Sequence, residues 1–208
     1  MPDDTPTAPP DEPGATPPDL DPFGASSGDH RRDAGYVGFA FRQCHPDHAG
    51  LAETVRASAA YPSRFTPPCG RFGVLYVALA PETAAAELRR RADQLGVPVA
   101  ALAPRAMLTL AVRLRRVLDL TNVAVRDAWG LTPEDLAGDD YARCQEVAVA
   151  ARADGYEAIR YPSAAVVRER SDKGDAPESD NLAVFADTLP PGSDVRVVRS
   201  ELLPLNDG

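Results

Sequence analysis

The feature that most constrains the fold of this chain is the apolar run of residues 73–80 and the proline that ends it. The run, GVLYVALA, is nearly all apolar, which is typical of a strand buried on both faces of a sheet. Pro81 stands where a helix accepts proline, in the first turn, and Glu82 suits the positive end of the helix dipole. We expect this helix to end near Leu95, because glycine and proline follow. The segment therefore predicts a buried strand that leads directly into a helix.

The rest of the chain body also alternates between strand and helix patterns. Thr132 and Pro133 form a typical helix start. We expect strands at 36–42, 107–113, 155–161, 181–186 and 195–199, a segment at 117–120 that continues or follows the second of these, helices at 51–60, 132–138 and 141–153, and a mobile loop at 168–180. Because helices do not alternate regularly with parallel-type strands, we predict an α+β fold rather than a doubly wound sheet.

The first thirty residues differ in composition from the rest. They contain seven acidic residues and no lysine or arginine, which leaves 24 acidic and 22 basic residues after them, so the net charge of −9 comes mostly from this segment. Proline, aspartate and small residues bury too little apolar surface to offset the entropy cost of ordering. We predict a disordered tail over residues 1–33 and one domain with a sizeable core over residues 34–208.

Several classes of protein and site are not expected. No apolar run reaches the roughly 18–20 residues that span a bilayer, and the N-terminus lacks the pattern of a signal peptide, so we predict a cytoplasmic protein with no membrane contact. The basic residues are dispersed and aromatic residues make up 6% of the chain, which argues against direct nucleic acid binding. Cys44, His45 and His48 fit no common zinc spacing, so we expect no metal site.

Eight short motifs follow one another in a characteristic order. They are Arg42, Arg64-Phe65, Leu75-Tyr76 and Glu87 in the first half, and Val117–Leu120, Asp154–Tyr156, Tyr161–Ala164 and Asn181–Phe185 in the second. This order resembles the RES domain, a family named for arginine, glutamate and serine positions. The resemblance covers roughly residues 36–187 and depends on order and spacing, since no single motif is long.

The resemblance implies a fold similar to that of ADP-ribosyltransferases of the diphtheria-toxin kind, with a mixed, split sheet flanked by helices and NAD as the substrate. RES toxins deplete NAD by hydrolysing or phosphorolysing its nicotinamide–ribose bond, and some relatives modify a protein instead. An antitoxin with a helix-turn-helix DNA-binding domain neutralises them. For this chain, the resemblance therefore implies an NAD-consuming toxin with a cognate antitoxin.

Three residues are the candidates for catalysis. Cleavage of the nicotinamide bond passes through an oxocarbenium-like ribose, which a carboxylate stabilises, and Glu87 is that candidate. Tyr76 is the candidate for stacking on the nicotinamide ring. Arg42 is the first candidate for the pyrophosphate, because the forked guanidinium matches phosphate oxygens.

Four further residues are candidates for binding NAD. Arg64 is the second candidate for the pyrophosphate, and Tyr61 is a second candidate for stacking on the nicotinamide ring. Ser163 follows a proline just past a strand, where its hydroxyl would bind the carboxamide or hold Glu87. Asn181, at the start of the next strand, is a candidate for supporting the site.

Each assignment has a purely structural alternative. Glu87 is spaced to pair with Arg90 and Arg91 at i+3 and i+4 of a solvated helix. Tyr76 suits a core position, and Arg42 suits an edge strand that avoids aggregation. Arg64 has a structural alternative of equal weight, and the serine and asparagine candidates would, in this interpretation, start a turn and a strand.

The chain also departs from the family in one loop. Many RES proteins carry a Gly-Gly-Arg-Trp-Asn-like run before the second strand, whereas residues 62–66 here read PSRFT. Glycines would let the backbone approach a phosphate closely. Two alternatives therefore stay open: a protein-directed ADP-ribosyltransferase that uses the loop 168–180 to bind its acceptor, and an inactive relative that binds a nucleotide or a partner.

Overall fold

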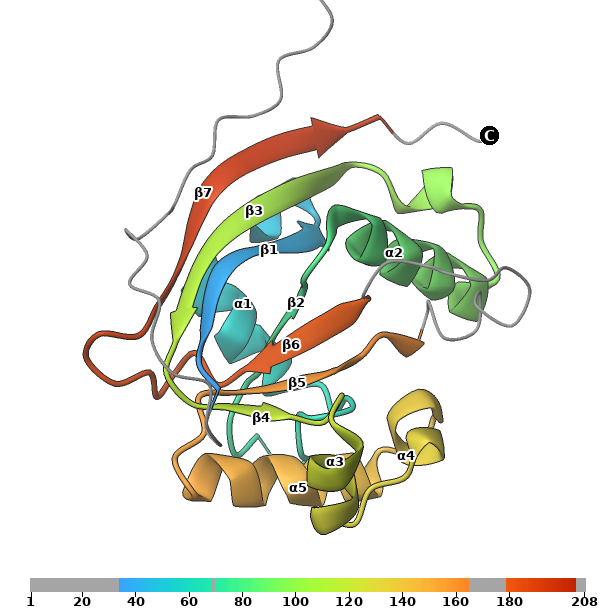
Figure 1. Cartoon of the computed structure of the whole chain (residues 1–208). Coiled ribbons are helices and arrows are strands. Elements are labelled where there is room, and N and C mark those ends of the chain that lie inside the picture. The colour runs from blue at the N-terminus through green and yellow to red at the C-terminus, as the bar shows by residue number, and fades with distance from the viewer. Residues whose placement is uncertain (1–33, 69, 165–178, 205–208) are drawn as a thin grey trace, which may run out of the picture.

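The computed structural model of this chain describes residues 34–68, 70–164 and 179–204. The segment 1–33 and residues 168–178 of the expected loop lie outside the described residues. Within the described part, seven strands form one mixed sheet in the order β4-β5-β6-β2-β1-β3-β7 (Figure 1). The strands are β1 (Tyr36–Cys44), β2 (Leu75–Ala78), β3 (Arg105–Leu114), β4 (Val117–Asp119), β5 (Ala158–Pro162), β6 (Asp180–Val184) and β7 (Asp194–Leu203). Neighbours are antiparallel except β4 and β5, which are parallel.

The sheet has two halves that meet at a narrow junction. β1, β3 and β7 form long ladders and curve together over one side of the molecule, whereas β4, β5, β6 and β2 are short (Figure 1). β1 and β2 connect these halves, and their described residues pair at one position, Phe41 with Ala78. The expected split of the sheet corresponds to this junction.

Helices lie on both faces and beside the junction of the sheet. They are α1 (Leu51–Ser58), α2 (Pro81–Leu95), α3 (Val123–Ala128), α4 (Pro133–Ala137) and α5 (Ala142–Ala153), with 3-10 helices η1 (Pro46–His48) and η2 (Val99–Leu102). α2 lies beside β1 and β2, and α3, α4 and α5 lie together beyond β4 and β5 (Figure 1). The α+β class predicted from the sequence is confirmed. None of the helices in the described ranges is long and apolar enough to cross a membrane.

Most predicted elements are present, and their differences from the prediction have local causes. α2 begins and ends at the predicted residues, and Gly96 ends it with a φ of 66°. β2 begins later than predicted because Gly73 packs against α1, where an added Cβ would lie 1.8 Å from the carbonyl oxygen of Val55. α3 was not predicted, and it begins where the side chain of Asn122 accepts hydrogen bonds from two backbone N–H groups.

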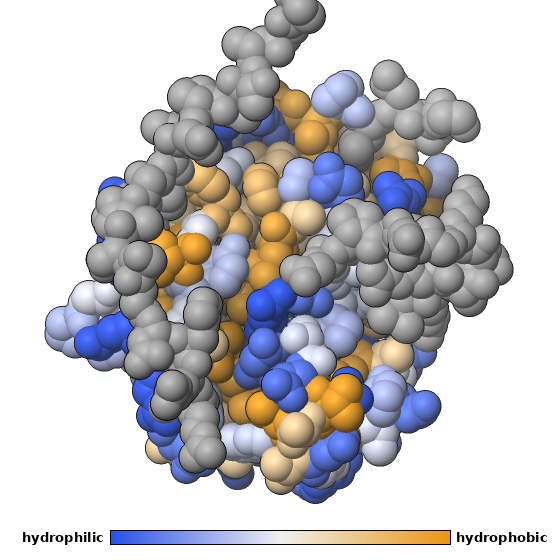
Figure 2. Space-filling model, in the orientation of Figure 1, coloured by the Kyte–Doolittle hydropathy of each residue, from blue (hydrophilic) through white to orange (hydrophobic). Residues whose placement is uncertain are grey.

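Two apolar clusters stabilise the sheet, one on each face. The cluster on the α5 face includes Phe65, Ile159 and Phe185, and the cluster on the α1 face includes Leu75 and Leu108. Burial of each such side chain contributes about 1.5–3 kcal/mol. On the surface, hydrophilic side chains gather near the centre of the face shown in Figure 2, with apolar side chains beside them.

Candidate active site

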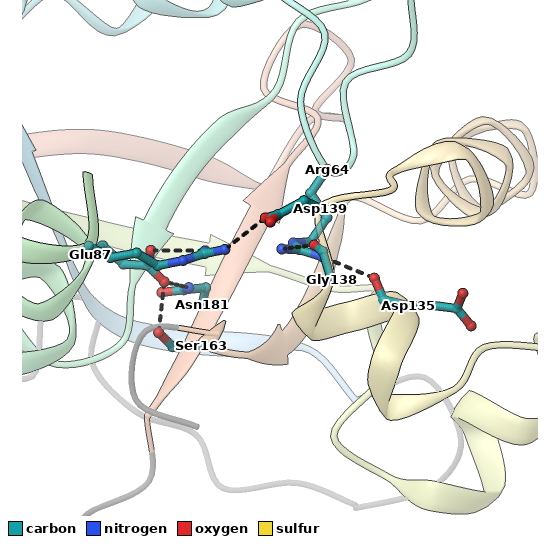
Figure 3. Close-up of polar contacts among 8 residues, drawn as sticks. Arg64, Glu87, Asp135, Gly138, Asp139, Ser163 and Asn181 are labelled. Carbon is teal, nitrogen blue, oxygen red and sulfur yellow. Dashed lines mark hydrogen bonds and ion pairs between the residues drawn. The ribbon is translucent and has the colours of Figure 1, made fainter. Parts of the chain in front are cut away.

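Glu87 lies at the centre of the candidate site, in the second turn of α2. Its carboxylate oxygen Oε1 accepts two hydrogen bonds, one from Oγ of Ser163 at 2.7 Å and one from Nδ2 of Asn181 at 2.9 Å (Figure 3). Ser163 follows β5 and Asn181 lies in β6, and both residues are buried. Three separate elements therefore hold one carboxylate in a fixed orientation.

The other carboxylate oxygen of Glu87 faces a weaker partner. Its Oε2 lies 4.0 Å from Nη1 of Arg90, which is the i+3 pair expected from the spacing of α2. The same guanidinium lies 3.5 Å from a carboxylate oxygen of Asp139 in the turn after α4 (Figure 3). The Glu87 side chain is 34% exposed. The Glu87 side chain therefore contacts Arg90 of its own helix through Oε2 and is also hydrogen-bonded to Ser163 and Asn181 through Oε1.

Tyr76 on β2 is fixed by the loop that precedes the strand. Its hydroxyl oxygen accepts a hydrogen bond from the backbone N–H of Phe65 at 2.8 Å. It also bonds the hydroxyl groups of Ser63, at 2.9 Å, and Thr66, at 3.2 Å. Ser63 and Thr66 in turn exchange two backbone hydrogen bonds. The loop with the unusual sequence is therefore a closed turn that holds the Tyr76 ring in place.

Arg42 lies at the junction between the two halves of the sheet. Its Nη1 donates a hydrogen bond of 2.8 Å to the backbone carbonyl of Tyr76, so the guanidinium bridges β1 and β2. Burial lowers the pKa of Arg42, and the nearby Cys44 thiol acts in the opposite direction. An arginine keeps its charge at neutral pH, so a buried positive charge is held at this point of the cleft.

A cleft of about 370 Å³ connects these side chains. Its lining residues come from β1, β2, α2, β3, β5 and β6, and they include Arg42, Tyr76, Glu87 and Asn181. A volume of this size falls within the range of about 300–1,000 Å³ that is usual for small-molecule sites. The structure therefore brings four of the sequence-predicted site residues to one cleft, with Ser163 directly behind the carboxylate.

Tyr161 is a lining residue that the sequence did not single out as a site residue. It lies opposite Asn181 in the β5–β6 ladder and is buried. Burial raises the pKa of Tyr161 well above its usual value, and the charges of Tyr76 and Glu87 add to that shift, while Arg64 and a hydrogen bond with Asn181 oppose it. The phenol is therefore neutral at physiological pH and keeps a proton to donate.

Besides Ser163, two sequence-predicted residues lie outside the lining of the cleft. Arg64 is buried. Its Nη1 donates a 3.0 Å hydrogen bond to the carbonyl of Asp135, and its Nη2 donates a 3.0 Å hydrogen bond to the carbonyl of Gly138 (Figure 3). Its guanidinium also stacks over the Tyr141 ring at 4.9 Å. Tyr61 lies just after the turn that follows α1, and it is 74% exposed. Arg64 therefore supports the end of α4, and Tyr61 faces solvent.

Besides Tyr161, three polar residues of the cleft were missed by the sequence analysis. Arg91 lies one helical turn after Glu87 on α2, Arg105 begins β3, and Gln43 lies next to Arg42 on β1. The i+4 spacing on α2 was a usable signal for Arg91. No local pattern marks the other two, because they reach the cleft through the pairing of β1 with β3.

Comparison with known proteins identifies the family and the fold of the chain. The family model of the RES domain matches residues 40–206. Among solved structures, the chain is similar to one in the crystal structure of the M. tuberculosis MbcT–MbcA toxin–antitoxin complex, with a TM-score of 0.70, 22% sequence identity, and coverage of 82% of this chain and 86% of that chain. No curated protein gives a significant match. The structural similarity extends over nearly the whole of both chains.

Proposed function

This chain belongs to the RES domain family, and on that premise we propose that it is a toxin that cleaves the nicotinamide–ribose bond of NAD. Water or phosphate accepts the ADP-ribose, so the reaction is a hydrolysis or a phosphorolysis. The observation that carries the proposal is the Glu87 carboxylate, which Ser163 and Asn181 hold through Oε1 in a cleft that also contains Arg42 and Tyr76.

The fixed carboxylate suits this chemistry. As the nicotinamide bond breaks, positive charge develops on the ribose. A carboxylate that is already oriented stabilises this charge without a reorganisation cost at the moment of reaction. Two hydrogen bonds to Oε1 orient Glu87 in this way, and Oε2 is then the atom that faces the ribose. Glu87 thereby supplies the electrostatic stabilisation of the transition state.

The aromatic and cationic residues of the cleft position the substrate. The Tyr76 ring, fixed through its hydroxyl group, provides a face on which the nicotinamide ring stacks. Arg42 holds the backbone of β2 at the same point through the Tyr76 carbonyl, and its charge favours the anionic part of the dinucleotide. A rigid site of this kind lowers the entropy cost of reaching the reactive geometry.

The toxin proposal includes a protein partner. The similar solved structure is that of a toxin–antitoxin complex, and we propose that a cognate antitoxin with a helix-turn-helix DNA-binding domain neutralises this chain. An antitoxin that covers the cleft of Glu87 and Arg42 would block NAD. Nicotinamide release that is lost when the antitoxin is added, and regained when NAD displaces it, would support this mode of neutralisation.

The deciding experiment measures nicotinamide release from NAD by the purified full chain, with and without phosphate. We expect release by the wild type and a loss of at least about a hundredfold in Glu87→Gln, because a transition-state charge partner is removed. Glu82→Gln is the matched control, since Glu82 is exposed in the first turn of the same helix. Release that persists in Glu87→Gln would exclude the proposed role of the carboxylate.

The acceptor is identified with NAD that is radiolabelled in its ADP-ribose part. Label recovered as free ADP-ribose supports hydrolysis, and label recovered as ADP-ribose 1″-phosphate supports phosphorolysis. Label that becomes attached to protein would instead identify a protein-directed ADP-ribosyltransferase. NAD binding without any product would identify an inactive relative and overturn the proposal.

A further inference from the structure

The cleft is cationic in a chain that is acidic overall. The charged residues that line it are three arginines, Arg42, Arg91 and Arg105, and one carboxylate, Glu87. The whole chain has a net charge of −9, most of it from the first thirty residues, and the remaining residues are close to neutral, with 24 acidic and 22 basic residues. Each arginine comes from a different element, β1, α2 or β3. A surplus of positive charge at a cleft of an acidic protein favours an anionic ligand.

The three arginines have different contacts. Arg42 is bound to the backbone carbonyl of Tyr76. Arg105 donates one hydrogen bond of 2.9 Å, from Nε to the carbonyl of Leu102. This bond fixes the side chain and does not use the two terminal nitrogens of the guanidinium group. Among the described residues, neither Arg91 nor Arg105 forms an ion pair with a carboxylate. These two guanidinium groups therefore have donors available for a ligand.

The position of the two arginines relative to Glu87 defines a direction along the cleft. Arg91 is four residues after Glu87 on α2, so the two side chains lie on the same helix face, about 6 Å apart along the axis. Arg105 precedes Ala106, which pairs with Cys44, and both Arg105 and Arg42 act on the Cys44 thiol. Arg105 and Arg42 thus lie together at the end of β1.

We propose that Arg91 and Arg105 form a diphosphate subsite, which holds the pyrophosphate of the dinucleotide while Glu87 faces the nicotinamide ribose. This inference rests on the proposed function for the identity of the substrate. Forked guanidinium groups bind phosphate oxygens with paired, charge-assisted hydrogen bonds. Arg42, whose Nη1 is already bound to the Tyr76 carbonyl, adds a third positive charge to the cleft. The chemical class of the ligand is a nucleoside diphosphate or its esters.

ADP is the probe for this subsite, because it carries the diphosphate without the nicotinamide ribose. Isothermal titration of the full chain with ADP and with adenosine compares the ligand with and without its charge. We expect ADP to bind more tightly than adenosine, with an affinity that falls as salt is raised. Arg91→Gln and Arg105→Gln should each weaken ADP binding about tenfold or more, since each removes a charge-assisted contact. Arg91→Lys should recover part of the affinity, because the charge returns without the fork.

Two controls separate this inference from the proposed function. Arg89→Gln changes an exposed arginine of the same helix that does not line the cleft, and it should bind ADP like the wild type. Glu87→Gln should bind ADP at least as tightly, since it removes the negative charge of the cleft. Arginine-dependent ADP binding without NAD cleavage would leave the subsite standing and overturn the proposed function. The subsite would be overturned if both Arg→Gln variants cleaved NAD with the wild-type KM, or if both bound ADP with the wild-type affinity.

Discussion

Oγ of Ser163 donates a 2.7 Å hydrogen bond to Oε1 of Glu87, although 76 residues separate the two in the chain. Asn181 reaches the same oxygen from the neighbouring strand. The helix that carries Glu87 lies beside β1 and β2, so these bonds connect it to the β5–β6 half of the sheet. The orientation of the carboxylate therefore depends on both halves of the fold.

Replacing Ser163 tests how much the orientation of Glu87 contributes to the reaction. In Ser163→Ala, Asn181 alone holds Oε1, and we expect kcat for nicotinamide release to fall about tenfold with little change in KM, as for a contact that matters mainly in the transition state. Ser200→Ala, at an exposed position of β7, is the control. A rise in KM at constant kcat would instead show that Ser163 binds the substrate.

Asn181→Asp places a second carboxylate beside Glu87 with almost no change in shape. Two neighbouring carboxylates raise the pKa of one of them, because both cannot be ionised at low cost. If activity requires ionised Glu87, the acidic limb of the profile of kcat/KM against pH moves to higher pH, by about one unit or more. Asn181→Ala removes the hydrogen bond without adding charge and should lower activity without this shift. An unshifted profile in Asn181→Asp would contradict the role of ionised Glu87.

Local signals explain which parts of the site the sequence predicted. Pro81 and Gly96 mark the two ends of α2, so the position of Glu87 one turn inside the helix was readable. The order of the motifs then related Glu87 to Ser163 and Asn181. The ends of α2 could be predicted because turn and capping residues act within a few positions, whereas Ser163 and Asn181 were related to Glu87 only through the family resemblance.

Long-range pairing explains the rest. Arg105 reaches the cleft because it begins β3, whose next residues, 106–114, pair with β1, and nothing near residue 105 reports that pairing. Arg64 bonds two carbonyl groups that lie 71 and 74 residues away, so its supporting position depends on where α4 packs. A sequence pattern identifies the residue type, but the direction of a side chain follows from contacts of this range.

Arg64→Met tests whether this arginine supports the fold rather than the substrate. The variant loses two charge-assisted hydrogen bonds to the end of α4 and the contact with the Tyr141 ring. We expect the free energy of unfolding to fall by about 2–4 kcal/mol, as measured by urea denaturation, with KM for NAD unchanged in the folded protein. Arg71→Met changes an exposed arginine and should alter neither quantity. Unchanged stability with a raised KM would instead show that Arg64 binds the substrate.

Tyr76→Phe separates the two functions of the tyrosine. The ring stays available for stacking, but the backbone N–H of Phe65 loses its hydroxyl acceptor. A buried donor without a partner costs about 1–3 kcal/mol, so we expect a lower melting temperature with KM for NAD close to that of the wild type. Tyr61→Phe, at an exposed tyrosine, should melt like the wild type. If Tyr76→Phe melted normally, the hydrogen bonds of the loop would not matter for stability.

Cys144 gives the protein a dependence of stability on alkaline pH. Burial raises the pKa of this thiol from its usual value of 9.0 to about 11, although Arg64 opposes the shift. The folded state then holds the proton more tightly, so the contribution to stability is complete below pH 9 and is lost as the pH rises towards 11. We expect the free energy of unfolding to fall less steeply over this range in Cys144→Ala than in the wild type, when urea denaturation is measured at both ends. Equal slopes in the two proteins would show that the thiol ionises as readily in the folded state as in the unfolded chain.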